Sequence, residues 1–158
     1  MANTQSMCTS FMGELMTATH NFGTAPIRAA TTADTFKAAL YLTSATINAA
    51  TTAYTVTGEV SGTNYSAGGV TVTNGTAPIA TNSSATAGVA YWTPSASFVY
   101  TTVTLSTAFD TVLLYNSTQS NKAVSVHTFG SQTITAGTFT LTMPSNTTTT
   151  ALLRLSTT

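Results

Sequence analysis

The stretch TFTLTM at residues 138–143 alternates hydroxyl-bearing and apolar side chains at every position. Successive side chains of a β-strand point to opposite faces, so this pattern places the threonines on one face and the apolar groups on the other. Threonine is also β-branched, which favours strands. The stretch therefore predicts a strand with one face toward a core and one neutral face directed outward.

Similar short apolar segments recur from residue 36 to residue 155. Clusters of Gly, Pro, Asn and Ser separate them and mark turns. The predicted strands cover residues 36–42, 70–73, 89–92, 98–105, 112–115, 123–129, 132–135, 139–143 and 151–155, with a further short strand near Tyr54. Many short strands at this spacing favour an antiparallel arrangement over a parallel sheet. We expect an all-β fold, an antiparallel β-sandwich of jelly-roll or immunoglobulin-like type, with a short N-terminal helix or arm.

The N-terminal segment differs from the rest, because its apolar residues recur at helical spacing between Ser6 and about Thr19. Ser6 is a candidate N-cap, and Gly23 and Pro26 would end the helix. Two interpretations remain open: the helix caps one end of its own sheet core, or it docks on a neighbouring subunit as an arm.

The arm interpretation divides the chain into residues 1–33, an N-terminal helix and linker, and residues 34–158, the β-sandwich domain. The residues that would bind a partner share apolar side chains; they are Met7, Phe11, Met12, Leu15, Met16 and Phe22. On this interpretation, deleting residues 1–30 should abolish partner binding and leave a folded β domain.

Charge is scarce in this chain. Only 5% of its 158 residues are charged, with four basic and four acidic side chains, whereas an average domain is about 25% charged. Threonine alone fills roughly a quarter of the positions. A chain with so little charge is expected to be packed in an assembly, because charged side chains dispersed over the surface normally keep a free monomer in solution. The threonine rows favour a neutral interface over an ice-binding array, which needs a fixed repeat period.

The same scarcity excludes several function classes. The net charge is zero and no basic cluster occurs, so we expect no nucleic-acid partner. No apolar segment approaches the ~20 residues of a membrane span, and the N-terminus lacks the pattern of a secretory signal. We therefore expect no membrane partner and synthesis in a cytoplasm.

The groups able to do acid–base or nucleophilic chemistry are few; they are Glu14, Asp34, Glu59, Asp110, His20, His127 and Cys8. No metal-ligand spacing and no Gly-x-Ser-x-Gly motif occurs among them. The single cysteine excludes an internal disulfide framework, and its place on the apolar stripe predicts a buried thiol. We expect a protein that is not an enzyme, with no catalytic residue, no metal site and no cofactor.

Several short stretches follow one another along the chain: MCTSF at 7–11, HNFG at 20–23, TFKAALY at 35–41, YSAGG at 65–69, LYNS at 114–117, NKAV at 121–124, AGTFT at 136–140 and LRL at 153–155. In this order they resemble a family of small structural virion proteins of tailed bacteriophages, including phages of cyanobacteria. The resemblance supplies no catalytic residues.

The resemblance implies a virion protein that is assembled in the host cytoplasm. Within a virion, the sequence suits a cement or decoration protein that binds the major capsid protein and stabilises the shell. Such a protein would be a homo-oligomer, with a trimer favoured. Two alternatives remain: a neck, tail or fibre-associated virion protein, and, from another class, a secreted adhesin or carbohydrate-binding module. For the second, the sequence offers a single tryptophan, Trp92, with Tyr91 and Tyr100 nearby but no evident cluster of aromatic sugar platforms.

Overall fold

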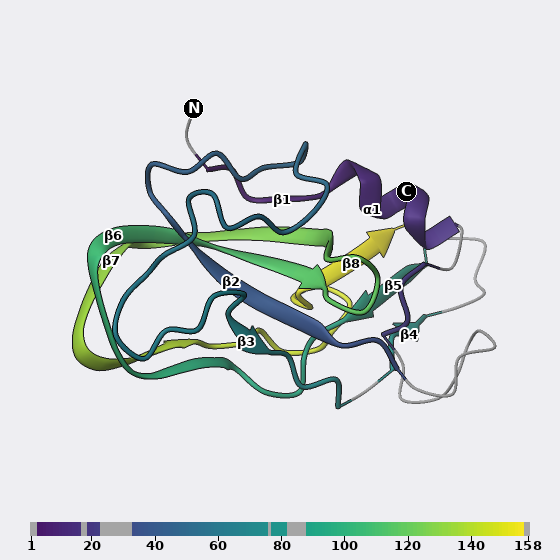
Figure 1. Ribbon diagram of the computed structural model, residues 1–158. Coiled ribbons are helices and arrows are strands. Elements are labelled where there is room, and N and C mark those ends of the chain that lie inside the picture. Colours follow the sequence, from purple (N-terminus) through teal and green to yellow (C-terminus); the bar gives the residue numbers. More distant parts are fainter. Residues whose placement is uncertain (1–2, 17–18, 23–32, 76, 82–87, 157–158) are drawn as a thin grey trace.

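The computed structural model describes residues 3–16, 19–22, 33–75, 77–81 and 88–156 (Figure 1). In them the chain forms two antiparallel sheets, of order β1-β7-β6-β2-β3 and β4-β5-β8. The elements are β1 (Ser6–Met7), α1 (Thr9–Met16), β2 (Phe36–Leu42), β3 (Val70–Thr71), β4 (Ile79–Ala80), β5 (Val89–Trp92), β6 (Phe98–Asn116), β7 (Lys122–Leu141) and β8 (Leu153–Ser156). The predicted all-β, sandwich-like fold is confirmed. None of the helices described here is long and apolar enough to span a membrane.

A long hairpin of β6 and β7 dominates the larger sheet. The sequence predicted five separate strands in this region, and that prediction was wrong. The structure has two strands of 19 and 20 residues. The punctuation at Gly130 and at Ala136-Gly137 lies inside β7, where the pairing register shifts and Ala136 takes a positive φ of 47°. Each interruption is accommodated as a β-bulge, which bends a strand without ending it.

The hairpin folds back over β2. Ala38 of β2 pairs with Leu114 in the second half of β6, while Tyr100 in the first half donates its hydroxyl hydrogen to the Ala38 carbonyl at 2.8 Å. Figure 1 shows both strands bending sharply together at one side of the molecule. Because both halves of β6 contact it, β2 is enclosed, and five of its seven side chains are buried.

One carboxylate holds the segment between β2 and β3. Glu59 accepts hydrogen bonds from the Tyr54 hydroxyl at 2.6 Å, the Tyr65 hydroxyl at 2.8 Å and the Gly68 amide at 2.7 Å. The strand predicted near Tyr54 is reduced to a single bridge between Ala53 and Lys122. Side-chain bonds to Glu59 thus take the place of a regular strand in ordering this segment.

The N-terminal helix is present but starts later than predicted. Ser6 is not its N-cap, because Ser6 pairs with Val126 as part of β1 on the edge of β7. The helix α1 begins at Thr9, and Phe11 on it is buried. Cys8, between the two elements, is fully buried, and burial raises the pKa of its thiol to about 11.

Aromatic packing joins the two sheets. The ring of Phe22 lies 4.4 Å from that of Phe36 on β2 and 4.7 Å from that of Trp92 on β5, centroid to centroid. Phe11 of α1 meets Phe22 edge-on at 5.9 Å. Phe11 and Phe22 therefore pack in the core of the same chain, as the capping interpretation expects.

Candidate functional site

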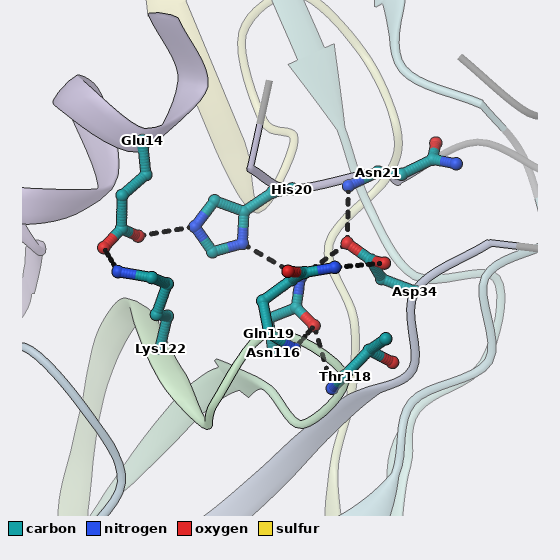
Figure 2. Close-up of polar contacts among 8 residues, drawn as sticks. All are labelled: Glu14, His20, Asn21, Asp34, Asn116, Thr118, Gln119 and Lys122. Atoms are coloured by element: carbon teal, nitrogen blue, oxygen red, sulfur yellow. Dashed lines mark hydrogen bonds and ion pairs between the residues drawn. The ribbon is translucent and has the colours of Figure 1, made fainter. Parts of the chain in front are cut away.

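A chain of polar side chains links α1 to the turn between β6 and β7 (Figure 2). The Lys122 ammonium donates to one Glu14 oxygen at 2.6 Å, and the other Glu14 oxygen lies 2.7 Å from Nε2 of His20. Burial would raise the pKa of Glu14, but the hydrogen bonds and charges of Lys122 and His20 outweigh it and hold that pKa below its usual value. Glu14 is therefore an anion held by two donors.

The amide of Asn116 fixes the protonation of His20. Its nitrogen lies 3.0 Å from Nδ1 of His20 and 2.8 Å from an Asp34 oxygen. An amide nitrogen can only donate, so Nδ1 accepts and the ring hydrogen is on Nε2, which donates to Glu14. Burial lowers the pKa of His20, and this effect exceeds the opposing effect of Glu14. The neutral imidazole is thus the form that satisfies both neighbours.

The same amide also organises the turn. Its oxygen accepts hydrogen bonds from the Thr118 and Gln119 amides, each at 3.1 Å. The Asp34 carboxylate accepts hydrogen bonds from the backbone amide of Asn21 at 2.9 Å and from the side-chain amide of Gln119 at 3.2 Å. The His20 side chain is 0% exposed, and Asn21, Asp34 and Asn116 are also buried, so these four residues of the cluster stabilise the fold.

The remaining acids are also engaged within the chain. Asp110 accepts hydrogen bonds from the Asn3 side chain at 2.9 Å and the Thr111 hydroxyl at 2.7 Å, and Glu59 holds the segment described above. All four carboxylates of the sequence thus have intrachain partners. In the part of the chain that the structure describes, no group of three or more metal-ligating side chains occurs.

A serine–histidine pair on β7 was not foreseen from the sequence. Ser125 Oγ lies 2.8 Å from Nε2 of His127, two positions along and on the same face of the strand. Burial lowers the pKa of His127 to about 4. The spacing of two is the only signal in the sequence, and it is common in strands rich in serine. Ser125 itself is 1% exposed, which leaves the pair a structural contact.

Four of the six predicted partner-binding residues meet at one apolar groove between α1 and the smaller sheet. Phe11 and Phe22 are buried, whereas Met7 and Leu15 are only partly buried. Met7, Phe11, Leu15 and Phe22 line this groove together with Tyr91, Leu155 and four other apolar residues. The side chains of Met12 and Met16 lie outside the described part of the structure. Met7 and Leu15 are thus the predicted residues that a partner could reach.

Comparison of the chain with family models, with curated proteins and with solved structures gave no match. Function is therefore inferred from the chemistry of the chain itself and from the expectations that its sequence raised.

Stability is expected to fall as the pH drops from 6.5 toward 4. The unfolded chain takes up a proton on each histidine near pH 6.5, while folded His127 does so only near pH 4; in this interval the unfolded state binds more protons, so acid favours unfolding. The depressed pKa of His127 corresponds to roughly 3 kcal/mol, and His20 acts in the same direction. Urea unfolding at several pH values measures the slope.

The matched variant for this prediction is His127→Gln, which keeps a polar side chain that does not titrate. Its free energy of unfolding should depend less steeply on pH than that of the natural chain between pH 6.5 and 4. An unchanged slope would contradict the assignment of a low pKa to His127.

Proposed function

We propose that this protein is a non-enzymatic structural component of a bacteriophage virion, a cement or decoration protein that binds the major capsid protein and stabilises the shell. The observation that carries the proposal is the use of all four carboxylates in internal hydrogen bonds, by Glu14, Asp34, Glu59 and Asp110. The four carboxylates of the chain thereby serve the fold, whereas a catalytic acid or base must lie within hydrogen-bond reach of a substrate.

A neutral surface suits a permanent assembly. Burying charge at an interface carries a desolvation cost, whereas hydroxyl groups can bond to a partner or pack against it at a lower cost. Many of the exposed side chains on the outer half of the hairpin bear a hydroxyl group; they are Thr101, Thr102, Ser106, Thr107, Ser131, Thr133, Thr135, Thr138 and Thr140. Repetition of modest contacts over a shell would give strong coupling through multivalency.

The groove at α1 is the proposed contact for an apolar segment of the capsid protein. Its accessible rim at Met7 and Leu15 coincides with residues chosen from the sequence for partner binding. Partly exposed apolar side chains beside a buried aromatic floor are the arrangement in which a few residues dominate binding.

The carbohydrate-binding alternative loses support. Trp92 is 2% exposed and Tyr100 is 3% exposed, so neither ring can serve as a platform for a sugar. The neck, tail or fibre alternative would share this fold and is separated from the capsid proposal by the number of copies per particle.

The first experiment is to count copies of the protein in purified virus particles by quantitative mass spectrometry against the major capsid protein. We expect a ratio near one per capsid subunit. A small fixed number of copies would assign the protein to the neck or tail, and its absence from particles would overturn the virion proposal.

Particles assembled without the protein can then be titrated with purified variants. Leu15→Ser should weaken binding by about tenfold, whereas Val56→Ser, at a 69% exposed valine outside the groove, should not.

A further inference from the structure

Among the described residues, no strand pairs with one edge of β7 over half of its length. On the side away from β6, Ser6 and Met7 pair with Val126 and Ser125, and the Cys8 amide donates to the Val124 carbonyl. This cover ends near Thr128, whose hydroxyl faces the Gln5 side chain at 3.4 Å. Beyond residue 128, no described strand pairs with β7 on this side. The first half of this edge is thus paired with β1, and the second half is paired with no strand in the part of the chain that the structure describes.

The free edge has only part of the usual protection against pairing. Native proteins guard edges with charges, prolines, bulges or covering segments. Residues 128–153 contain no Asp, Glu, Lys or Arg, and the only proline, Pro144, lies beyond the end of β7. A bulge guards the middle of the edge near Ala136. From Phe139 to Leu141 the register with β6 is regular, so this end of the strand is open to a further strand.

The two faces at this end are suited to extension. Thr138 and Thr140 are exposed on the outer face, while Phe139 and Leu141 on the inner face are only partly buried against the core. A neighbouring strand with the same alternation would cover the exposed flanks of Phe139 and Leu141 and place its own threonines beside Thr138 and Thr140. Cross-strand pairs of this kind stabilise a sheet.

We propose that residues 137–141 of β7 pair antiparallel with the same residues of a second copy of this chain across a twofold axis. The segment is uncharged, so pairing with its own copy brings no like charges together. Its copy also carries the same alternation of threonine and apolar side chains, so threonines would lie beside threonines and apolar groups beside apolar groups. An edge that pairs with itself is an isologous contact and closes as a dimer. The proposal is thus for a dimer, whereas the sequence analysis favoured a trimer. The inference concerns contacts between copies alone and goes beyond the proposed binding to a capsid.

The test uses the purified full chain, without particles, in sedimentation velocity across a concentration series. We expect a dimer of twice the 16.2 kDa chain mass. In Thr138→Lys/Thr140→Lys, like charges would face each other across the axis, and the dissociation constant should rise at least tenfold. Thr101→Lys, an exposed threonine on the neighbouring strand β6, is the matched control and should remain dimeric.

Charge complementation separates edge pairing from a general effect of charge or misfolding. Thr138→Glu/Thr140→Glu alone should also be monomeric, and an equal mixture of the Lys and Glu variants should recover a dimer.

Hydrogen exchange of the natural chain gives a check without mutation, because amides within residues 137–142 should exchange more slowly at high protein concentration. A natural chain that is monomeric or trimeric, a Lys variant that dimerises as well as the natural chain, or concentration-dependent protection elsewhere would overturn the proposal.

Discussion

A chain lacking residues 1–30 is expected to lose cooperative folding, with a fall in the free energy of unfolding of at least ~5 kcal/mol, a large part of the stability of a typical domain. The deletion removes Phe11, His20 and Phe22 from the core. It also uncovers Phe36 and Trp92, which the Phe22 ring contacts from both sheets. The arm interpretation predicted a folded remainder, and the buried position of these residues is the reason for the opposite expectation.

Circular dichroism and urea unfolding of the truncated and full chains test this prediction. Phe22→Ala in the full chain isolates one contribution and should cost about 3–5 kcal/mol, with a smaller cost for Phe22→Leu, which keeps most of the apolar volume. A truncated chain that unfolds cooperatively with nearly the stability of the full chain would contradict the packing of the N-terminal segment between the sheets.

Asn116→Ala is expected to lower the free energy of unfolding by about 3–5 kcal/mol, because it leaves several buried groups without a partner at once. The substitution removes the donor to Nδ1 of His20 and one donor to the Asp34 carboxylate. It also removes the acceptor of the Thr118 and Gln119 amides in the hairpin turn.

Urea unfolding near pH 7 gives the size of this effect. Asn48→Ala is the matched control, since Asn48 Oδ1 accepts one exposed turn amide, from Ala50, and its loss should cost no more than ~1 kcal/mol. Asn116→Asp keeps an acceptor for the turn but sets a second carboxylate beside Asp34, so it should be destabilised as well. Equal small losses at Asn116 and Asn48 would show that the cluster in Figure 2 does not support the fold.

The local sequence pattern predicted which segments form strands better than it predicted where the strands begin and end. Short apolar segments between turn residues placed β2, β5 and β8 within a few residues of their observed bounds. The same patterns wrongly predicted that β7 is interrupted by turns at Gly130 and Ala136. A short run of Gly, Ala or Ser has the same composition in a bulge as in a turn. Only the register with the partner strand distinguishes the two. Likewise, the apolar stripe of the N-terminal helix is the same whether it packs on its own sheet or on another subunit.

The carboxylates and histidines could be identified as candidates from the sequence, but their grouping with other residues could not. His20 and Asn116 are 96 positions apart, and Glu14 and Lys122 are 108 positions apart. Asn116 and Gln119 were read only as turn residues, since nothing in their neighbourhood points to a buried partner far along the chain.

By itself, the sequence determined the strand-forming alternation, the apolar helical stripe and the shortage of charge, because each depends on residue types over a few adjacent positions. Only the tertiary structure decided that the four carboxylates are engaged internally, that Phe22 contacts aromatic rings of both sheets and that no described strand pairs with half of the β7 edge. These features arise from contacts between segments distant in sequence, and such contacts are set by the packing of the whole core.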